Sequence, residues 1–257
     1  MRYSTNTRQD EKDDLVRKKG VWRFLEVLSG NFRDLIKINL LFCLCVLPSV
    51  AAFILGLFGF YSVYMYVLAL LAALSAGGAL SSCVFCISKM LRDEPGYVWH
   101  DFRRKFNENM KQAAVPGVLC AAFVYMQVLV WGSMIGSEVG IDAVWVIMGA
   151  VVLLIFGMVA PYVFLQFAYI DLGVPQILKN SILISFMNAP RSAMGAVCGG
   201  AIWLVFALFL PGSLIFAPLF LLIGFSLSCL LCLMWVWPPV DKQFSIEETL
   251  RSKQEER

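Results

Sequence analysis

The stretch that decides the fold is Trp99–Ala113, with the sequence WHDFRRKFNENMKQA, which lies between two long blocks of apolar residues. Its apolar side chains recur at steps of three or four, and charged or polar side chains fill the positions between them. This period is typical of an amphipathic helix that lies in a membrane interface. The apolar set is Trp99, Phe102, Phe106, Met110 and Ala113. Basic side chains favour the cytoplasmic side of a membrane, and those of the other face are Arg103, Arg104, Lys105 and Lys111.

The rest of the chain is apolar enough to cross a membrane six times. Of its 257 residues 60% are hydrophobic and only 15% are charged, far from the average soluble domain. A span needs ~20 apolar residues to cross a hydrocarbon core. The stretches of that kind are 35–58, 62–88, 113–135, 143–170, 193–210 and 213–237. We therefore expect one all-α, six-span membrane domain at 21–240, between a mixed-charge cytoplasmic tail at 1–20 and a charged tail at 241–257.

The placement of the 21 Lys and Arg residues predicts how these spans are oriented. Basic residues lie before the first span, after the last one, and in the two connections between hairpins, whereas the loops around 59, 136–142 and 211–212 carry none. Cytoplasmic loops are enriched in Lys and Arg. We therefore expect both termini in the cytoplasm and three hairpins that face outward.

Each hairpin is expected to follow a cytoplasmic or interfacial amphipathic helix. Before the first span the apolar residues form one stripe, at Val21, Leu25, Leu28, Phe32 and Leu35. The three segments also align with one another, because Asn31, Asn109 and Asn188 are spaced by 78 and 79 residues. This spacing has two interpretations. One is a pseudo-threefold repeat about an axis along the membrane normal, and the other is that any six-span chain of this topology carries similar segments.

Within the spans, the polar side chains of greatest interest are three amides, Asn39, Gln127 and Gln166. Amides of this kind most often form hydrogen bonds between membrane helices, although they could also contact a solute. All eight cysteines lie within spans, including the two pairs Cys83-x-x-Cys86 and Cys229-x-x-Cys232. Buried cysteines usually act as small packing residues, and a soft-metal site is the minor alternative. We expect neither a metal nor a cofactor.

Several motifs resemble those of the YesL-like bacterial membrane proteins. Asn39-Leu40-Leu41 followed by Leu47-Pro48 is similar to the motif of that family's first span, although residues 49–52 depart from the run that often follows it. Lys179-Asn180-Ser181 is similar to its third cytoplasmic segment. The most specific match is Phe102, Phe106, Asn109, Lys111, Gln112 and Ala113. The family is a domain of unknown function associated with carbohydrate use, so the resemblance implies a bacterial inner membrane and a sugar-uptake context.

The sequence argues against catalysis and leaves two functional classes. It has a single histidine, His100, and no nucleophile–base pair, metalloprotease motif, phosphate-binding loop or dinucleotide-binding motif, so we expect neither an enzyme nor a nucleic-acid-binding protein. No ionisable side chain lies in the middle of a span, which argues against an ion-coupled transporter. The first class is a non-catalytic accessory or assembly component that contacts anionic lipid and for which the family resemblance suggests a sugar-uptake permease as partner; the alternative is an uncoupled transporter or channel for a small neutral solute. The candidate contact residues are Phe102, Arg103, Arg104, Phe106, Asn109 and Lys111.

Overall fold

The computed structural model describes residues 20–59, 61–94, 96–135, 143–170, 172–209 and 216–246, and every regular element among them is a helix. The helices are α2 (Val21–Gly30), α3 (Phe32–Leu57), α4 (Ser62–Ala72), α5 (Leu74–Leu91), α6 (Val98–Ile135), α7 (Ala143–Tyr169), α8 (Val174–Met187), α9 (Ala189–Phe209), α10 (Phe216–Leu219), the π-turn η2 (Phe220–Gly224) and α11 (Phe225–Phe244). Residues 1–19 and 247–257, which make up most of the two expected tails, lie outside the described residues.

Six of these helical segments are long and apolar enough to cross a membrane. They are Phe32–Leu57, Val63–Leu91, Val98–Ser133, Val144–Tyr169, Ala189–Phe206 and Phe220–Phe244. The expectation of an all-helical protein with six spans is therefore confirmed. Large apolar side chains along these helices are exposed on the outside of the protein, as contact with lipid requires.

Helix α5 lies at the centre of the packing, because 13 of its 18 residues are buried. It contacts α3, α6, α7 and α11. Small residues at Gly77 and Gly78 let α6 approach closely, so that a Cβ atom added at Gly77 would lie 1.8 Å from the carbonyl oxygen of Ala113. Small residues are the usual means by which membrane helices pack without a hydrophobic driving force between them. The main core therefore forms around α5.

The amphipathic segment Trp99–Ala113 does not form a separate helix, which corrects the sequence-based expectation. It makes up the first turns of α6, which continues through Pro116 for 38 residues. At 1.5 Å per residue such a helix is ~57 Å long, about twice the thickness of a hydrocarbon core. Its charged turns can therefore extend beyond the membrane in line with the span that follows them.

Two asparagines mark bends between consecutive helices. Asn31 separates α2 from α3, and its backbone N–H and side-chain Nδ2 both donate to the carbonyl of Val27, at 3.0 and 3.2 Å. Asn188 separates α8 from α9 and donates in the same way to Ile184, again at 3.0 and 3.2 Å. Asn109 differs, because it lies inside α6 without a break. The first and third segments therefore share a local geometry that the second lacks.

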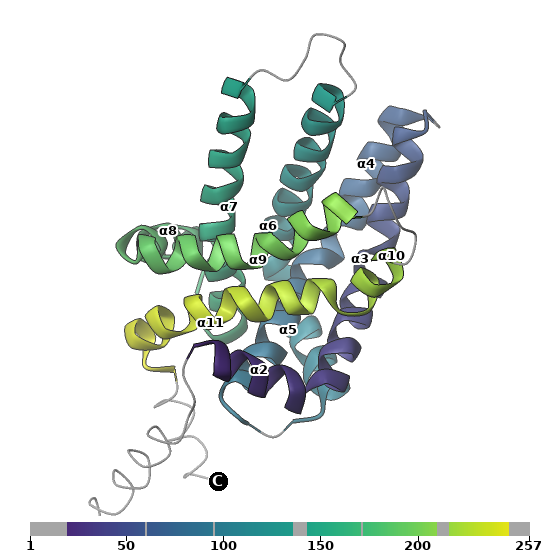
Figure 1. Cartoon of the computed structure of the whole chain (residues 1–257). Coiled ribbons are helices and arrows are strands. Elements are labelled where there is room, and N and C mark those ends of the chain that lie inside the picture. The colour runs from purple at the N-terminus through teal and green to yellow at the C-terminus, as the bar shows by residue number, and fades with distance from the viewer. Residues whose placement is uncertain are drawn as a thin grey trace, which may run out of the picture.

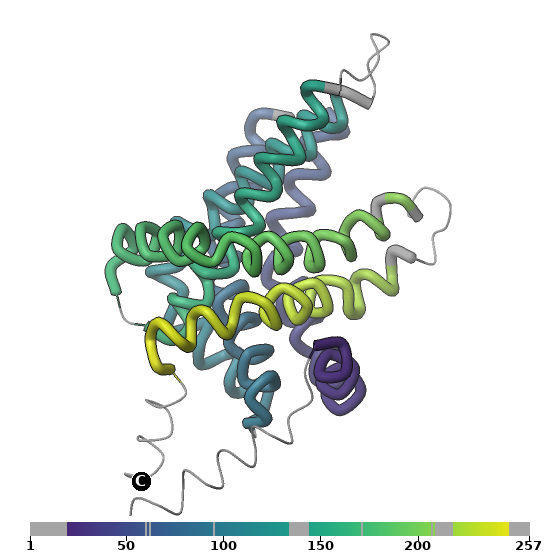
Figure 2. The backbone as a smooth tube through the Cα atoms, turned by 60° about the vertical axis from the view of Figure 1, so that its left-hand side comes forward, coloured from purple at the N-terminus to yellow at the C-terminus, as the bar shows by residue number. Residues whose placement is uncertain are grey.

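The last two spans run in another direction from the first four. In Figures 1 and 2, α9 and α11 lie side by side and cross the direction of α6 and α7, while α3 and α4 run broadly parallel to that direction. A repeat about an axis parallel to the first two hairpins would place the third hairpin parallel to them as well. The pseudo-threefold repeat is therefore not confirmed, and three outward-facing hairpins remain a prediction.

The final helix also extends further than expected. The sequence suggested that the last span ends at Trp237, before Pro238 and Pro239, but both prolines lie inside α11, which continues to Phe244. Proline costs a helix one hydrogen bond and strains the preceding turn. Burial of Trp237, Pro239 and Val240 against the core compensates for that cost.

Candidate functional site at the charged end of the helices

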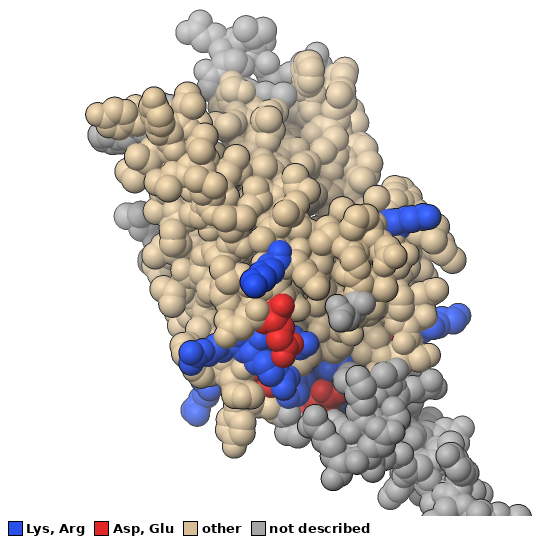
Figure 3. Space-filling model, turned by 180° about the vertical axis from the view of Figure 1, so that it is seen from behind, with Lys and Arg blue, Asp and Glu red and all other residues tan. Residues whose placement is uncertain are grey.

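Most of the charged residues in Figure 3 gather toward one end of the molecule, which we call the charged end. Most of the remaining surface in that view is uncharged. The ion-paired residues of the charged end are Arg23, Glu26, Asp34, Lys37, Lys89, Arg92, Asp93, Glu94, Asp101, Arg104, Lys105 and Glu108. They come from α2, the first turns of α3, the end of α5, the connection after it, and the start of α6.

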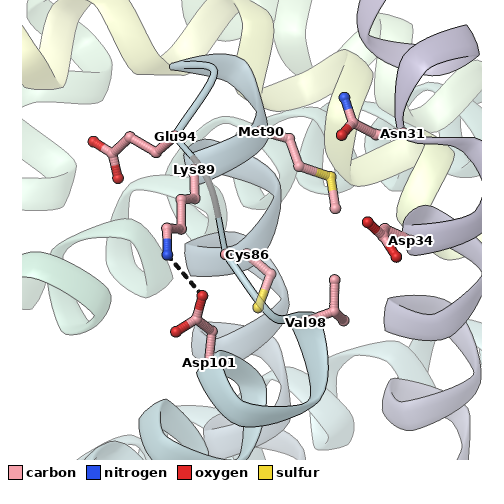
Figure 4. A pocket seen from close by; sticks show the side chains of 9 residues that line it. Asn31, Asp34, Cys86, Lys89, Met90, Glu94, Val98 and Asp101 are labelled. Atoms are coloured by element: carbon pink, nitrogen blue, oxygen red, sulfur yellow. Dashed lines mark hydrogen bonds and ion pairs between the residues drawn. The ribbon is translucent and has the colours of Figure 1, made fainter.

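A pocket of about 320 Å³ opens at this end, where the bend between α2 and α3 faces the connection between α5 and α6. In Figure 4, Asn31 and Asp34 form one side of it, the ion-paired Lys89 and Asp101 form the other, and Met90 reaches toward Asn31 and Asp34. The nine lining residues are Asn31, Asp34, Cys86, Lys89, Met90, Glu94, Gly96, Val98 and Asp101. The lining therefore includes both charged or polar side chains and the apolar side chains of Met90 and Val98.

The ion pair between Lys89 and Asp101 joins the end of α5 to the start of α6. Its Nζ–Oδ2 distance is 2.7 Å, and the two side chains are only 18% and 10% exposed. Arg104 approaches the other carboxylate oxygen at 3.6 Å. Gly96 packs against the pair so closely that an added Cβ atom would lie 2.5 Å from both the Lys89 Nζ and the Asp101 Oδ2. The backbone therefore fixes the position of this pair, and the pair fixes one wall of the pocket.

Arg92 forms a second, buried junction next to the pocket. Its guanidinium group lies 5.0 Å from the centre of the Tyr169 ring and 4.8 Å from that of Trp237, and it donates to the Tyr169 hydroxyl at 2.9 Å. Glu94 pairs with the same guanidinium at 3.0 Å, and Tyr169 also hydrogen-bonds Ser88 at 2.6 Å. A buried, stacked arginine of this kind is strongly held. This junction ties α5 to α7 and α11.

The sequence did not single out Arg92. Its partners Tyr169 and Trp237 lie far along the chain at the ends of other spans. The available signal was an arginine just after one span and aromatic residues at the ends of two others. That pattern also fits ordinary interfacial anchoring.

The first turns of α6 present two different faces. Phe102 is 4% exposed and lies in the main core, and the partly buried Phe106 packs beside it with the ring centres 6.4 Å apart. Asn109 is buried and donates to the Ser81 hydroxyl at 3.4 Å. The outward face carries exposed basic residues, which include Arg103, Arg104 and Lys111. The predicted contact residues therefore divide into an inward group and an outward group.

Asn39 is fully buried and contacts the π-turn before α11. Its Nδ2 donates to the Leu221 carbonyl at 2.5 Å, and its Oδ1 accepts from the Ser226 backbone N–H at 2.8 Å. One carboxamide therefore satisfies a backbone acceptor and a backbone donor of the helix that contains the π-turn. Asn39 thus forms hydrogen bonds between α3 and another helical segment, which is the more common use of such an amide in membrane proteins.

The other two amides lie elsewhere. Gln127 accepts from Trp131 Nε1 on the same helix at 3.2 Å, and the fully buried Gln166 donates to Ser181 on α8 at 2.8 Å. Asn39, Gln127 and Gln166 thus have three separate sets of partners. They do not converge on one another through any of these hydrogen bonds.

All four cysteines of the two Cys-x-x-Cys pairs, on α5 and α11, lie in the main core or pack against it. Among the described residues, no group of three or more His, Cys, Asp or Glu side chains could hold a metal ion. Packing within the core is therefore the interpretation of these cysteines that the geometry favours.

In comparisons with known proteins, no family model, no curated protein and no solved structure matches this chain. The resemblance to the YesL-like family stays a prediction.

Proposed function

We propose that the chain is a non-catalytic accessory or assembly component of a bacterial inner membrane, with its charged end in the cytoplasm and a sugar-uptake permease as its partner. The observation that carries the proposal is the two-faced start of α6. The inward side is fixed on α5 by the buried Phe102, so the outward side is held in one orientation. A fixed surface binds a partner with less loss of conformational entropy than a mobile one does.

The outward side has the residue types that protein interfaces favour. Tyr97, just before α6, is 85% exposed and Trp99 in its first turn is 63% exposed, and Arg103 is exposed one turn further on. Tyr, Trp and Arg are enriched at protein interfaces and among the residues that contribute most of the binding energy. Anionic lipid headgroups would attract the same basic residues. The sugar-uptake context is supported only by the sequence resemblance.

The separation of the three amides favours this role over uncoupled passage of a neutral solute. A pathway for such a solute needs polar groups that line a common route. Here the Asn39 carboxamide is occupied at both ends by backbone groups of another helix. Gln127 and Gln166 pair with different residues on different helices. These contacts support a structural use of the amides.

The test uses a photoreactive benzophenone amino acid placed at Tyr97 or Arg103 of the full chain in native membranes. We expect both positions to crosslink the same permease subunit, identified by mass spectrometry. The matched control is Val151, an exposed residue in the middle of α7, which should give lipid adducts only.

Two results would contradict the proposal. One is the absence of any protein adduct at both positions while the control reacts with lipid. The other is uptake of a labelled neutral sugar or polyol by proteoliposomes that contain the purified chain alone, which would establish the transporter alternative.

A further inference from the structure

Helix α2 has two apolar faces, and the described part of the chain covers only one of them. On the inner face Val27 is 1% exposed, and Phe24 and Leu28 pack against the main core. Arg23 holds the helix in place by donating to the Leu91 carbonyl at 2.8 Å and to the Asp93 carboxylate at 2.5 Å. Arg23 therefore anchors the helix to the end of α5 and the turn after it, and α2 also contacts α3 and α11.

The outer face consists of large apolar residues that contact no other part of the described chain extensively. Val21 is 72% exposed, Trp22 70% and Leu25 46%. These three positions lie within about one third of a turn of one another on a helical projection. The sequence had assigned Val21, Leu25 and Leu28 to a single stripe, but the structure places Leu28 inward and adds Trp22 to the outward set.

We infer that the outer face of α2 lies in the phospholipid headgroup layer of the membrane that α3 crosses. The first argument is continuity with the lipid-facing side of α3. Directly after the bend at Asn31, Phe32 is exposed, and further along the same helix so are the residues Leu40, Leu44 and Leu47. The exposed apolar side chains thus continue from α2 into a candidate span.

The second argument is the direction of the helix. Figures 1 and 2 show α2 lying across the lower end of the molecule, at a steep angle to α6 and α7. A helix that lies in a membrane surface typically runs along it, with apolar residues facing the acyl chains and Trp at the headgroup level. The exposed Lys37, with a side chain 63% exposed one turn into α3, is placed to face anionic headgroups. This lipid contact is independent of the accessory role proposed above.

The test places a benzophenone amino acid at Trp22 or Leu25 of the full chain in phosphatidylethanolamine and phosphatidylglycerol vesicles. We expect phospholipid adducts at both positions, comparable in yield with those from Leu44 on α3 and several-fold above those from His100. His100 is the matched control because its side chain is 72% exposed at the same end of the molecule. Since Trp22, Leu25, Leu44 and His100 are all exposed, the variants should unfold at the temperature of the parent protein.

Two outcomes would overturn the inference. The first is that Trp22 and Leu25 react with lipid no more than His100 does while Leu44 reacts strongly, which would place the outer face in water. The second is that, in native membranes, both positions yield adducts with a second protein in place of phospholipid. A variant that melts below the parent is replaced by the same probe at Val21, so that the comparison is made on folded protein.

Discussion

Asn39 completes the backbone hydrogen bonding of a helix to which it does not belong. Its carboxamide bonds the Leu221 carbonyl and the Ser226 N–H, and the adjacent rings of Phe42 and Phe225 stack with centres 3.7 Å apart. The amide and the ring stack together fix α3 against the π-turn. A π-turn inside a helix often marks a functional position, but here its open hydrogen bonds have a partner within the protein.

We predict that Asn39→Leu lowers stability substantially. It leaves two buried backbone groups without partners, at a cost of ~1–3 kcal/mol each. Asn39→Asp should also destabilise, because a carboxylate cannot donate to the Leu221 carbonyl and would bury a charge. The measurement is thermal unfolding in detergent, with Asn107→Leu at an exposed position of α6 as the control. Equal melting of Asn39→Leu and Asn107→Leu would show that the hydrogen bonds contribute little.

Gly117 on α6 faces Gly77 on α5 where the two helices cross closely. A Cβ atom added there would lie 2.3 Å from the backbone nitrogen of Gly77, whereas one added at Gly132 on the same helix meets nothing within 4 Å. Gly117→Ala should therefore force the helices apart and destabilise the protein by ~1–3 kcal/mol or more. Gly132→Ala should be neutral or slightly stabilising, since Ala favours a helix. Unfolding of the two variants side by side gives the comparison, and a neutral Gly117→Ala would mean that α5 and α6 are not tightly packed at this crossing.

Among the elements, the sequence predicted the existence of the helices well and their ends less well. Length and hydropathy identify a span because every backbone group in a bilayer must be satisfied within the protein. The ends depend on tertiary contacts: Phe102 packing on α5 extends the third span into charged turns, and burial of Pro239 extends the last one beyond two prolines. The junction around Arg92 was missed for the same reason, since its partners come from α7 and α11.

The docking of α6 on α5 leads to a graded prediction. Phe102→Ala removes a ring that is 4% exposed and should cost ~3–5 kcal/mol. Phe106→Ala removes a partly buried ring and should cost less, while Phe102→Leu retains most of the apolar contact. Arg103→Gln, on the exposed side of the same turn, serves as the control for loss of charge. If all four variants melt together in detergent, the segment is an electrostatic anchor and its aromatic side is not docked.

At the scale of the whole molecule, the loop charges and the direction of the last two helices indicate different arrangements in the membrane. The distribution of Lys and Arg predicts three hairpins that cross the membrane alike. In the structure α9 and α11 run across the first four spans (Figures 1 and 2). The α9 and α11 segments are nonetheless apolar and long enough to span a membrane. Labelling from one side of the membrane distinguishes a crossing from an in-plane arrangement.

We predict that Asn107→Cys and Gln176→Cys react with a membrane-impermeant maleimide only after the cytoplasmic side is opened, because basic segments stay inside. Gly59→Cys, Ser137→Cys and Gly212→Cys should react in intact cells, since their loops carry no Lys or Arg. The native cysteines lie within the helices of the described chain, so labelling of the unsubstituted protein gives the background. If Asn107→Cys reacts from outside, the predicted orientation is wrong. The charged end and its pocket would then lie outside the cytoplasm, where a cytoplasmic partner could not reach them. If Gly212→Cys alone is protected from the reagent, the first four spans cross the membrane as predicted but α9 and α11 do not. The chain would then have four spans and a pair of helices that lie in the plane of the membrane.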